Sequence, residues 1–166
     1  TPAEDAGNYA AEVMLDAPIA YWRLDEASGT SVADYTGHGH TGTTNNGPSP
    51  GLVTRAQTTL LTAVNGGVRS TKFYEYGARV DVPTSTAFDT SAFTIEFFTS
   101  KGAGSFCPVW HHPGRMRVLM AGAAIDVFFW ASGAWSHKWR FSGLTGGDDL
   151  ENHHVVITYD GSTHVS

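Results

Sequence analysis

Aromatic residues with polar neighbours are the part of this sequence best suited to ligand chemistry. Trp135, His137 and Trp139 recur at every second position of one segment, so an uninterrupted strand would carry all three on one face. Indole faces stack on the C–H faces of sugar rings, and an imidazole beside them hydrogen-bonds to hydroxyl groups. This spacing predicts a carbohydrate-binding surface. The alternative is that Trp139, together with Trp130, is part of the hydrophobic core, and for Trp135 both an exposed and a core position stay open.

Acidic and turn-forming residues near the start of the chain form a second candidate site. Asp34 precedes the turn Thr36-Gly37-His38-Gly39, which is rich in carbonyl groups, and Asp25 would supply a second charge. Ca²⁺ takes oxygen ligands of this kind. The sequence therefore suggests a structural calcium ion held by Asp34 and Asp25. The alternative, which we favour, is that Asp34 accepts hydrogen bonds from nearby backbone amides and holds the loop.

Other reactive residue types are poorly placed for zinc binding or catalysis. The eight His residues include adjacent pairs at 111–112 and 153–154, and adjacent residues of a strand point to opposite faces rather than to one metal ion. Glycoside hydrolysis uses two carboxylates set across the scissile bond. Asp25 and Glu26 are adjacent, however, while Glu96 and Asp126 each stand alone in their strands. We expect no enzymatic activity, and a glycan hydrolase or lyase is the least favoured function.

Composition restricts the partners of the protein. The net charge is −6 and the ten Lys and Arg are scattered, so no basic stripe exists to neutralise a phosphate backbone and nucleic acid is not an expected partner. No apolar run is long enough to cross a bilayer as a helix, so membrane insertion is not expected. The single Cys107 excludes an intrachain disulfide.

Hydrophobic periodicity predicts one short helix followed by many strands. Residues 1–8 are predicted to be a linker or disordered lead-in, and Asn8 is predicted to cap a helix that ends at Met14, ahead of Pro18. The polar, Gly-rich segment 25–51 predicts loops. Strands are predicted at 19–24, 68–76, 78–82, 93–99, 108–111, 115–120, 124–131, 135–141 and 154–159. The chain from 9 to 166 is therefore predicted to be one all-β domain, a two-sheet antiparallel sandwich whose core contains Trp22, Ile95, Phe97 and Ile157.

The end of the chain is unusual for such a domain. Asp160-Gly161 favours a hairpin turn, yet only residues 162–166 follow. We expect the domain to be truncated at its C-terminal end or, failing that, to receive a strand from another chain.

Three blocks of this sequence resemble the laminin G-like, or concanavalin A-like, jelly-roll family. The first contains Tyr21-Trp22-Arg23-Leu24-Asp25-Glu26 followed by Ser28-Gly29-Thr30. The second runs from Val80 to Phe98, and the third from His153 to Gly161. The blocks span most of the chain in the order expected for that family. The resemblance implies a two-sheet jelly roll.

The same resemblance implies a role and a location. Relatives in bacteria and bacteriophages are modules of surface proteins and minor tail proteins. The expected function is therefore that of a non-catalytic adhesion module that recognises host cell-surface glycan. Its expected location is a virion, as a phage tail or capsid-associated protein, or a bacterial cell surface. The alternative is a structural decoration or assembly domain that contacts neighbouring virion subunits, as a homo-oligomer or as part of a larger polypeptide.

Overall fold

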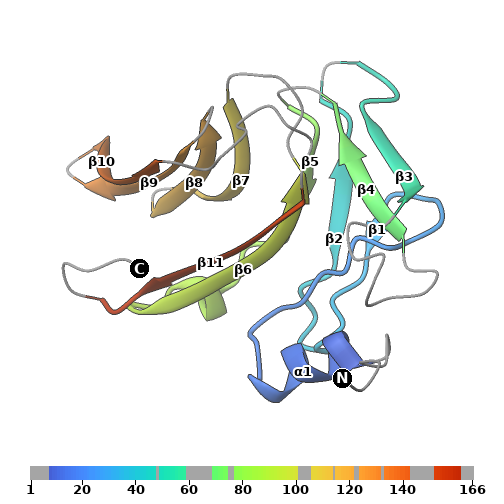
Figure 1. Ribbon diagram of the computed structural model, residues 1–166, viewed down its shortest axis with the longest axis horizontal. Coiled ribbons are helices and arrows are strands. Elements are labelled where there is room, and N and C mark those ends of the chain that lie inside the picture. The colour runs from blue at the N-terminus through green and yellow to red at the C-terminus, as the bar shows by residue number, and fades with distance from the viewer. Residues whose placement is uncertain are drawn as a thin grey trace. The chain divides into compact units, whose positions relative to one another are not determined.

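The computed structural model describes residues 8–47, 49–58, 69–74, 77–100, 106–113, 115–121, 124–131, 133–142 and 152–161. The chain divides into two compact units, Thr1–Thr90 and Ser91–Ser166. Most of the described residues are in antiparallel strands, and one short α-helix is present (Figure 1). The predicted all-β class with one N-terminal helix is therefore confirmed. No described helix has the length and apolarity that a bilayer crossing requires.

The first unit contains the helix and two small sheets. Helix α1 spans Asn8–Leu15, one residue beyond its predicted end. One sheet has the strand order β1-β2-β5, with β1 at Ser31–Val32, β2 at Gly42–Asn45 and β5 at Arg79–Asp81. The other pairs β3 (Val53–Thr58) with β4 (Arg69–Phe73). A 3₁₀ turn, η1, covers Thr86–Phe88. Gly42 is required where β2 meets β5, because a Cβ there would come 2.5 Å from Val80 Cγ1.

The predicted strand at 19–24 is wrong. This segment makes a single antiparallel bridge, between Trp22 and Asp34. Ala17 and Leu24 have φ angles of 47° and 57°, and left-handed residues at both ends of a segment interrupt an extended strand. Trp22 instead donates from Nε1 to the carbonyl of His40 at 2.7 Å and packs 6.2 Å from the ring of Phe88.

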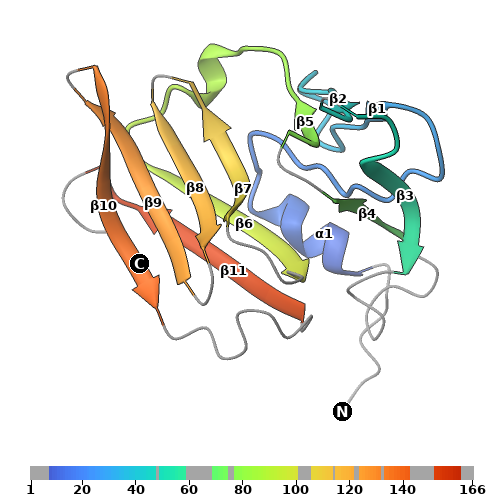
Figure 2. The same ribbon diagram turned by 90° about the horizontal axis from the view of Figure 1, so that it is seen from above.

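The second unit consists of two sheets that face each other (Figures 1 and 2). One has four strands in the order β10-β9-β8-β7 and the other pairs β11 with β6, all antiparallel. Their bounds are β6 Phe93–Ser100, β7 Phe106–His112, β8 Met116–Ala121, β9 Ala124–Ala131, β10 Ala134–Ser142 and β11 Asn152–Tyr159. All six strands predicted from residue 93 onward are confirmed. The predicted truncation concerns residues after Gly161, which lie outside the described residues.

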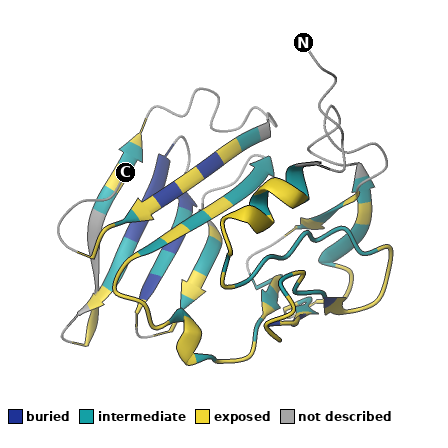
Figure 3. Ribbon diagram, turned by 90° about the horizontal axis from the view of Figure 1, so that it is seen from below, coloured by how far each residue is buried: buried dark blue, intermediate teal, exposed yellow. Residues whose placement is uncertain are grey.

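The core of the second unit lies between these sheets. Alternate residues of β8, β9 and β11 form one buried cluster: Met116, Val118, Met120, Ile125, Val127, Val155 and Ile157. Figure 3 shows the alternation of buried and exposed positions along the strands. Val118 and Val127 have no exposed surface, and burying each side chain contributes about 1.5–3 kcal/mol. Ile95 and Phe97 pack on the cluster as predicted. Trp22 is not part of it and lies in the other unit.

Candidate functional site

The four-stranded sheet of the second unit carries an unusual set of side chains on the face turned away from β6 and β11, here called the outer face. Strand alternation places Arg117 of β8, and Asp126, Phe128 and Trp130 of β9, on this side, because their neighbours in sequence face the core. In Figure 2 this face is turned toward the viewer, and no described helix or strand of the same unit lies over it. Trp130 is 40% exposed.

A cation stacks on an aromatic ring on the outer face. The guanidinium carbon of Arg117 lies 4.4 Å from the ring centroid of Phe128, a cation–π contact. His111 of β7 is the register partner of Arg117 on its other side. Burial lowers the pKa of His111, and the positive charges of Arg117 and His112 lower it further. A lowered pKa disfavours the protonated form of His111, so the positive charge at this part of the face is that of Arg117.

One carboxylate of the described outer face is held by an arginine. Asp126 is 1% exposed and accepts from Arg140 Nε and Nη2, each at 2.7 Å. These paired bonds, together with the charge of Asp126, raise the pKa of Arg140. A bidentate pair of this kind fixes both side chains. The sequence alone indicates an isolated carboxylate at this position, because the arginine that binds it is fourteen residues away.

The predicted sugar-binding residues are divided by a break in β10. The side chains of Trp135 and His137 lie outside the described part, but their backbone register places them opposite Trp130 and Phe128. The register then shifts between His137 and Trp139, and Trp139 pairs with Val127. Since Val127 and Phe128 face opposite sides of the sheet, the expected alternation across β10 does not hold.

Trp139 packs on the core side of the sheet. Its ring meets Phe129 edge-on at 5.7 Å and Tyr159 at 6.0 Å. This is the core alternative that the sequence left open for this residue. For Trp130 the structure gives the opposite result, because its side chain is exposed on the outer face. The aromatic residue most accessible to a ligand on the described part of this sheet is therefore Trp130.

Asp34, the predicted calcium ligand, is surrounded by hydrogen-bond donors. Its Oδ1 accepts from the backbone N–H of Tyr21 (3.2 Å), and from the N–H (3.0 Å) and hydroxyl (2.7 Å) of Thr36, while Oδ2 accepts from the N–H of His40 (2.9 Å). Burial raises the pKa of Asp34, but these hydrogen bonds outweigh it and bring the pKa to about 2. The geometry is that of a carboxylate that holds a loop, and a Ca²⁺ ion at this carboxylate would have to displace these donors.

Asp25, the second predicted ligand, is also engaged. Its Oδ2 lies 3.1 Å from Arg23 Nη2, and its Oδ1 accepts from the Tyr35 hydroxyl at 3.2 Å. Arg23 lies over the ring of Tyr35, 5.1 Å from its centroid. Within the described residues, no group of three or more His, Cys, Asp or Glu side chains is placed to hold a metal ion.

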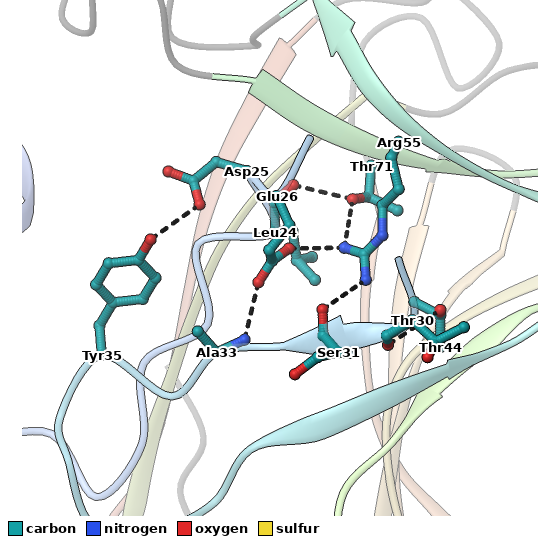
Figure 4. A network of polar contacts seen from close by, with 10 residues as sticks. All are labelled: Leu24, Asp25, Glu26, Thr30, Ser31, Ala33, Tyr35, Thr44, Arg55 and Thr71. Carbon is teal, nitrogen blue, oxygen red and sulfur yellow. Dashed lines mark hydrogen bonds and ion pairs between the residues drawn. The ribbon is translucent and has the colours of Figure 1, made fainter. Parts of the chain in front are cut away.

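A polar network that the sequence did not predict joins β3 to the opening loops (Figure 4). Arg55 Nη1 donates to Glu26 Oε2 at 2.7 Å and to the Thr71 hydroxyl at 3.1 Å, and its Nη2 donates to the carbonyl of Ser31 at 3.0 Å. Only 8% of the Arg55 side chain is exposed, and its Nε has no partner among the described residues. The register shift between Thr54 and Gln57 contains Arg55, and such a bulge redirects a side chain.

Three histidines in the described part of the chain are held by contacts with other residues. His38 Nδ1 lies 2.9 Å from the carbonyl oxygen of Ile19. His40 is buried, with its ring 4.7 Å from that of Phe88. His154 stacks on Phe98 at 4.2 Å and meets Glu96 Oε1 at 2.8 Å. These contacts account for the placement of the three side chains without a metal ion.

Comparisons with known proteins add no assignment to this geometry. Searches against protein-family models, curated proteins and solved structures gave no significant match to the chain.

Proposed function

We propose that the protein is a non-catalytic, glycan-binding adhesion module, built as a laminin G-like or concanavalin A-like jelly roll and carried by a virion or bacterial surface protein. The observation that supports it best is Trp130, an indole 40% exposed on the outer face. An exposed indole offers the apolar surface on which a sugar ring stacks. Position 135, predicted from the sequence to contact sugar, is its register partner, and position 137 pairs with Phe128.

Two further observations favour binding over catalysis at this face. Asp126 is neutralised by its bidentate contact with Arg140, so it is poorly suited to act as a nucleophile or as a proton donor. The remaining described outer-face groups that carry charge are cations, which bind and orient a ligand. The proposal therefore assigns contact and orientation, and no reaction, to this face.

A glycan array with matched variants tests the proposal. The wild-type protein and Trp130→Ala are compared with Val156→Ala, which removes another exposed apolar side chain (47% exposed) from the other sheet of the same unit. We expect the wild-type and V156A proteins to bind the same glycans and W130A to lose the signal while keeping its circular dichroism spectrum. Equal binding by W130A would contradict the role assigned to Trp130. Binding by none of the three proteins, together with self-association, would favour the structural assembly alternative.

A further inference from the structure

Acidic sugars are the ligand class that the outer face selects. Resting on the proposed function, we infer that the glycan is acidic and that Arg117 binds its carboxylate while Trp130 stacks on its ring. The stack of Arg117 on Phe128, next to Trp130 on β9, leads to this inference.

Register places these groups in one row across the sheet. His111 pairs with Arg117, Arg117 pairs with Phe128, and Phe128 pairs with position 137. Adjacent strands are about 4.8 Å apart, so the row runs for roughly 15 Å perpendicular to the strands. Trp130 lies two residues along β9 from Phe128, on the same side and about 7 Å away. A sugar ring stacked on Trp130 therefore has its substituents within reach of Arg117.

The charge of this face contrasts with that of the whole chain. The protein carries a net charge of −6, yet Arg117 and Arg140 lie on the described outer face, where Asp126 is the one described acid. The described outer face is therefore positive on balance. Local charge complementarity favours a ligand with one carboxylate near an apolar ring face. The negative charge of the rest of the protein disfavours a long polyanion such as nucleic acid.

The stacking of Arg117 suits it to carboxylate binding. A guanidinium stacks on a ring through its flat face, whereas it binds a carboxylate bidentately through its N–H edge, so both contacts are compatible. Contact with Phe128 at 4.4 Å restricts the guanidinium before the ligand arrives, which reduces the conformational entropy lost on binding. A lysine at this position would keep the charge but lose both the planar stack and the paired donors.

Matched pairs of sugars test the inference. Each pair contains an acidic sugar and its neutral counterpart: sialyllactose with lactose, and oligogalacturonate with its carboxyl-reduced form. Binding is measured for the wild-type protein, for Arg117→Gln and Arg117→Lys, and for the control Arg69→Gln. Arg69 is an exposed residue of β4 in the other unit, and its loss changes the net charge by the same amount. A charge-assisted contact corresponds to about tenfold or more in affinity. We expect the acidic member of a pair to bind at least about tenfold tighter, R117Q to abolish that preference, R117K to reduce it and R69Q to leave it intact.

Other outcomes are distinguishable. Equal binding of acidic and neutral sugars that still requires Trp130 would overturn the acidic-ligand inference and leave the proposed function standing. If no sugar binds, both fail. An R117Q variant whose circular dichroism has changed is replaced in the comparison by R117K, and a full acid preference in R117K would contradict the paired-donor contact.

Discussion

Replacing Asp34 with asparagine tests how the opening loop is held. The carboxylate accepts the hydrogen bonds of Tyr21, Thr36 and His40, and the last of these goes to Oδ2. In the D34N variant an NH₂ group replaces one carboxylate oxygen, so at least one N–H donor loses its acceptor. Lowering a pKa from 3.8 to about 2 corresponds to about 2 kcal/mol of stabilisation. Because Asp34 is only partly buried, solvent screening reduces this, and we expect D34N to lose about 1–2 kcal/mol at neutral pH.

The sign of the pH dependence follows from the lowered pKa. The folded-state pKa of Asp34 is below its value of 3.8 in the unfolded chain, so the stabilisation is fully present above about pH 4 and is lost as the pH falls toward 2. The assay is amide hydrogen exchange at Thr36 and His40, whose N–H groups donate to Asp34, combined with a carboxyl NMR titration. The matched control is Asp16→Asn, which removes the same charge from an exposed position.

Two results would refute this reasoning. One is a titration midpoint of Asp34 near 3.8, and the other is unchanged protection of Thr36 and His40 in D34N. The same samples separate loop holding from calcium binding. If Asp34 only holds the loop, EDTA leaves the melting temperature unchanged, whereas a fall in the melting temperature that added Ca²⁺ reverses would establish the calcium site at Asp34 and Asp25.

Three other substitutions test the remaining contacts. Arg55→Met removes a cation that is almost fully buried and leaves its acceptors without a donor. The free energy of unfolding, measured by urea denaturation, should therefore fall by about 2–4 kcal/mol. The control is R69M at an exposed site, and an equal loss of unfolding free energy in R55M and R69M would contradict the network. Arg140→Gln leaves the carboxylate of Asp126 buried without its bidentate partner. The single variant R140Q should therefore lower the melting temperature more than the double variant R140Q/D126N does. A larger fall in the double variant would contradict a charge-based pair. His154→Ala removes a half-exposed contact with Glu96 and should change stability by about 0.5 kcal/mol or less. A loss near ~2 kcal/mol would show that the stack of His154 on Phe98 contributes more than an exposed polar contact does.

The strands of the second unit were predictable because their alternation is strong. Phe93, Ile95 and Phe97 face the core as their spacing indicates, and burial of one sheet face imposes such a period on any sequence. The loop role of Asp34 was predictable for a similar local reason, since a carboxylate two residues before Thr36, in a turn that continues with Gly37, suits an Asx-type turn. In both cases the determining contacts are close in sequence or repeat regularly.

The failed predictions share a different cause. The strand expected at 19–24 is interrupted by left-handed Ala17 and Leu24, residue types that give no sequence signal for that conformation. The face of Trp139 was unpredictable because a single bulge in β10 reverses the alternation. Arg55 meets Glu26 across 29 residues of sequence, and a contact of that range depends on how the loops pack rather than on any local pattern.

Glycan titration of the isotope-labelled protein tests the central claim most directly. On addition of sialyllactose, we predict that the backbone amide resonances of Arg117, Phe128 and Trp130 shift together, while those of β6 and β11 stay in place. Shifts confined to the first unit, or the absence of shifts with any acidic or neutral sugar, would contradict a glycan-binding surface on the outer face.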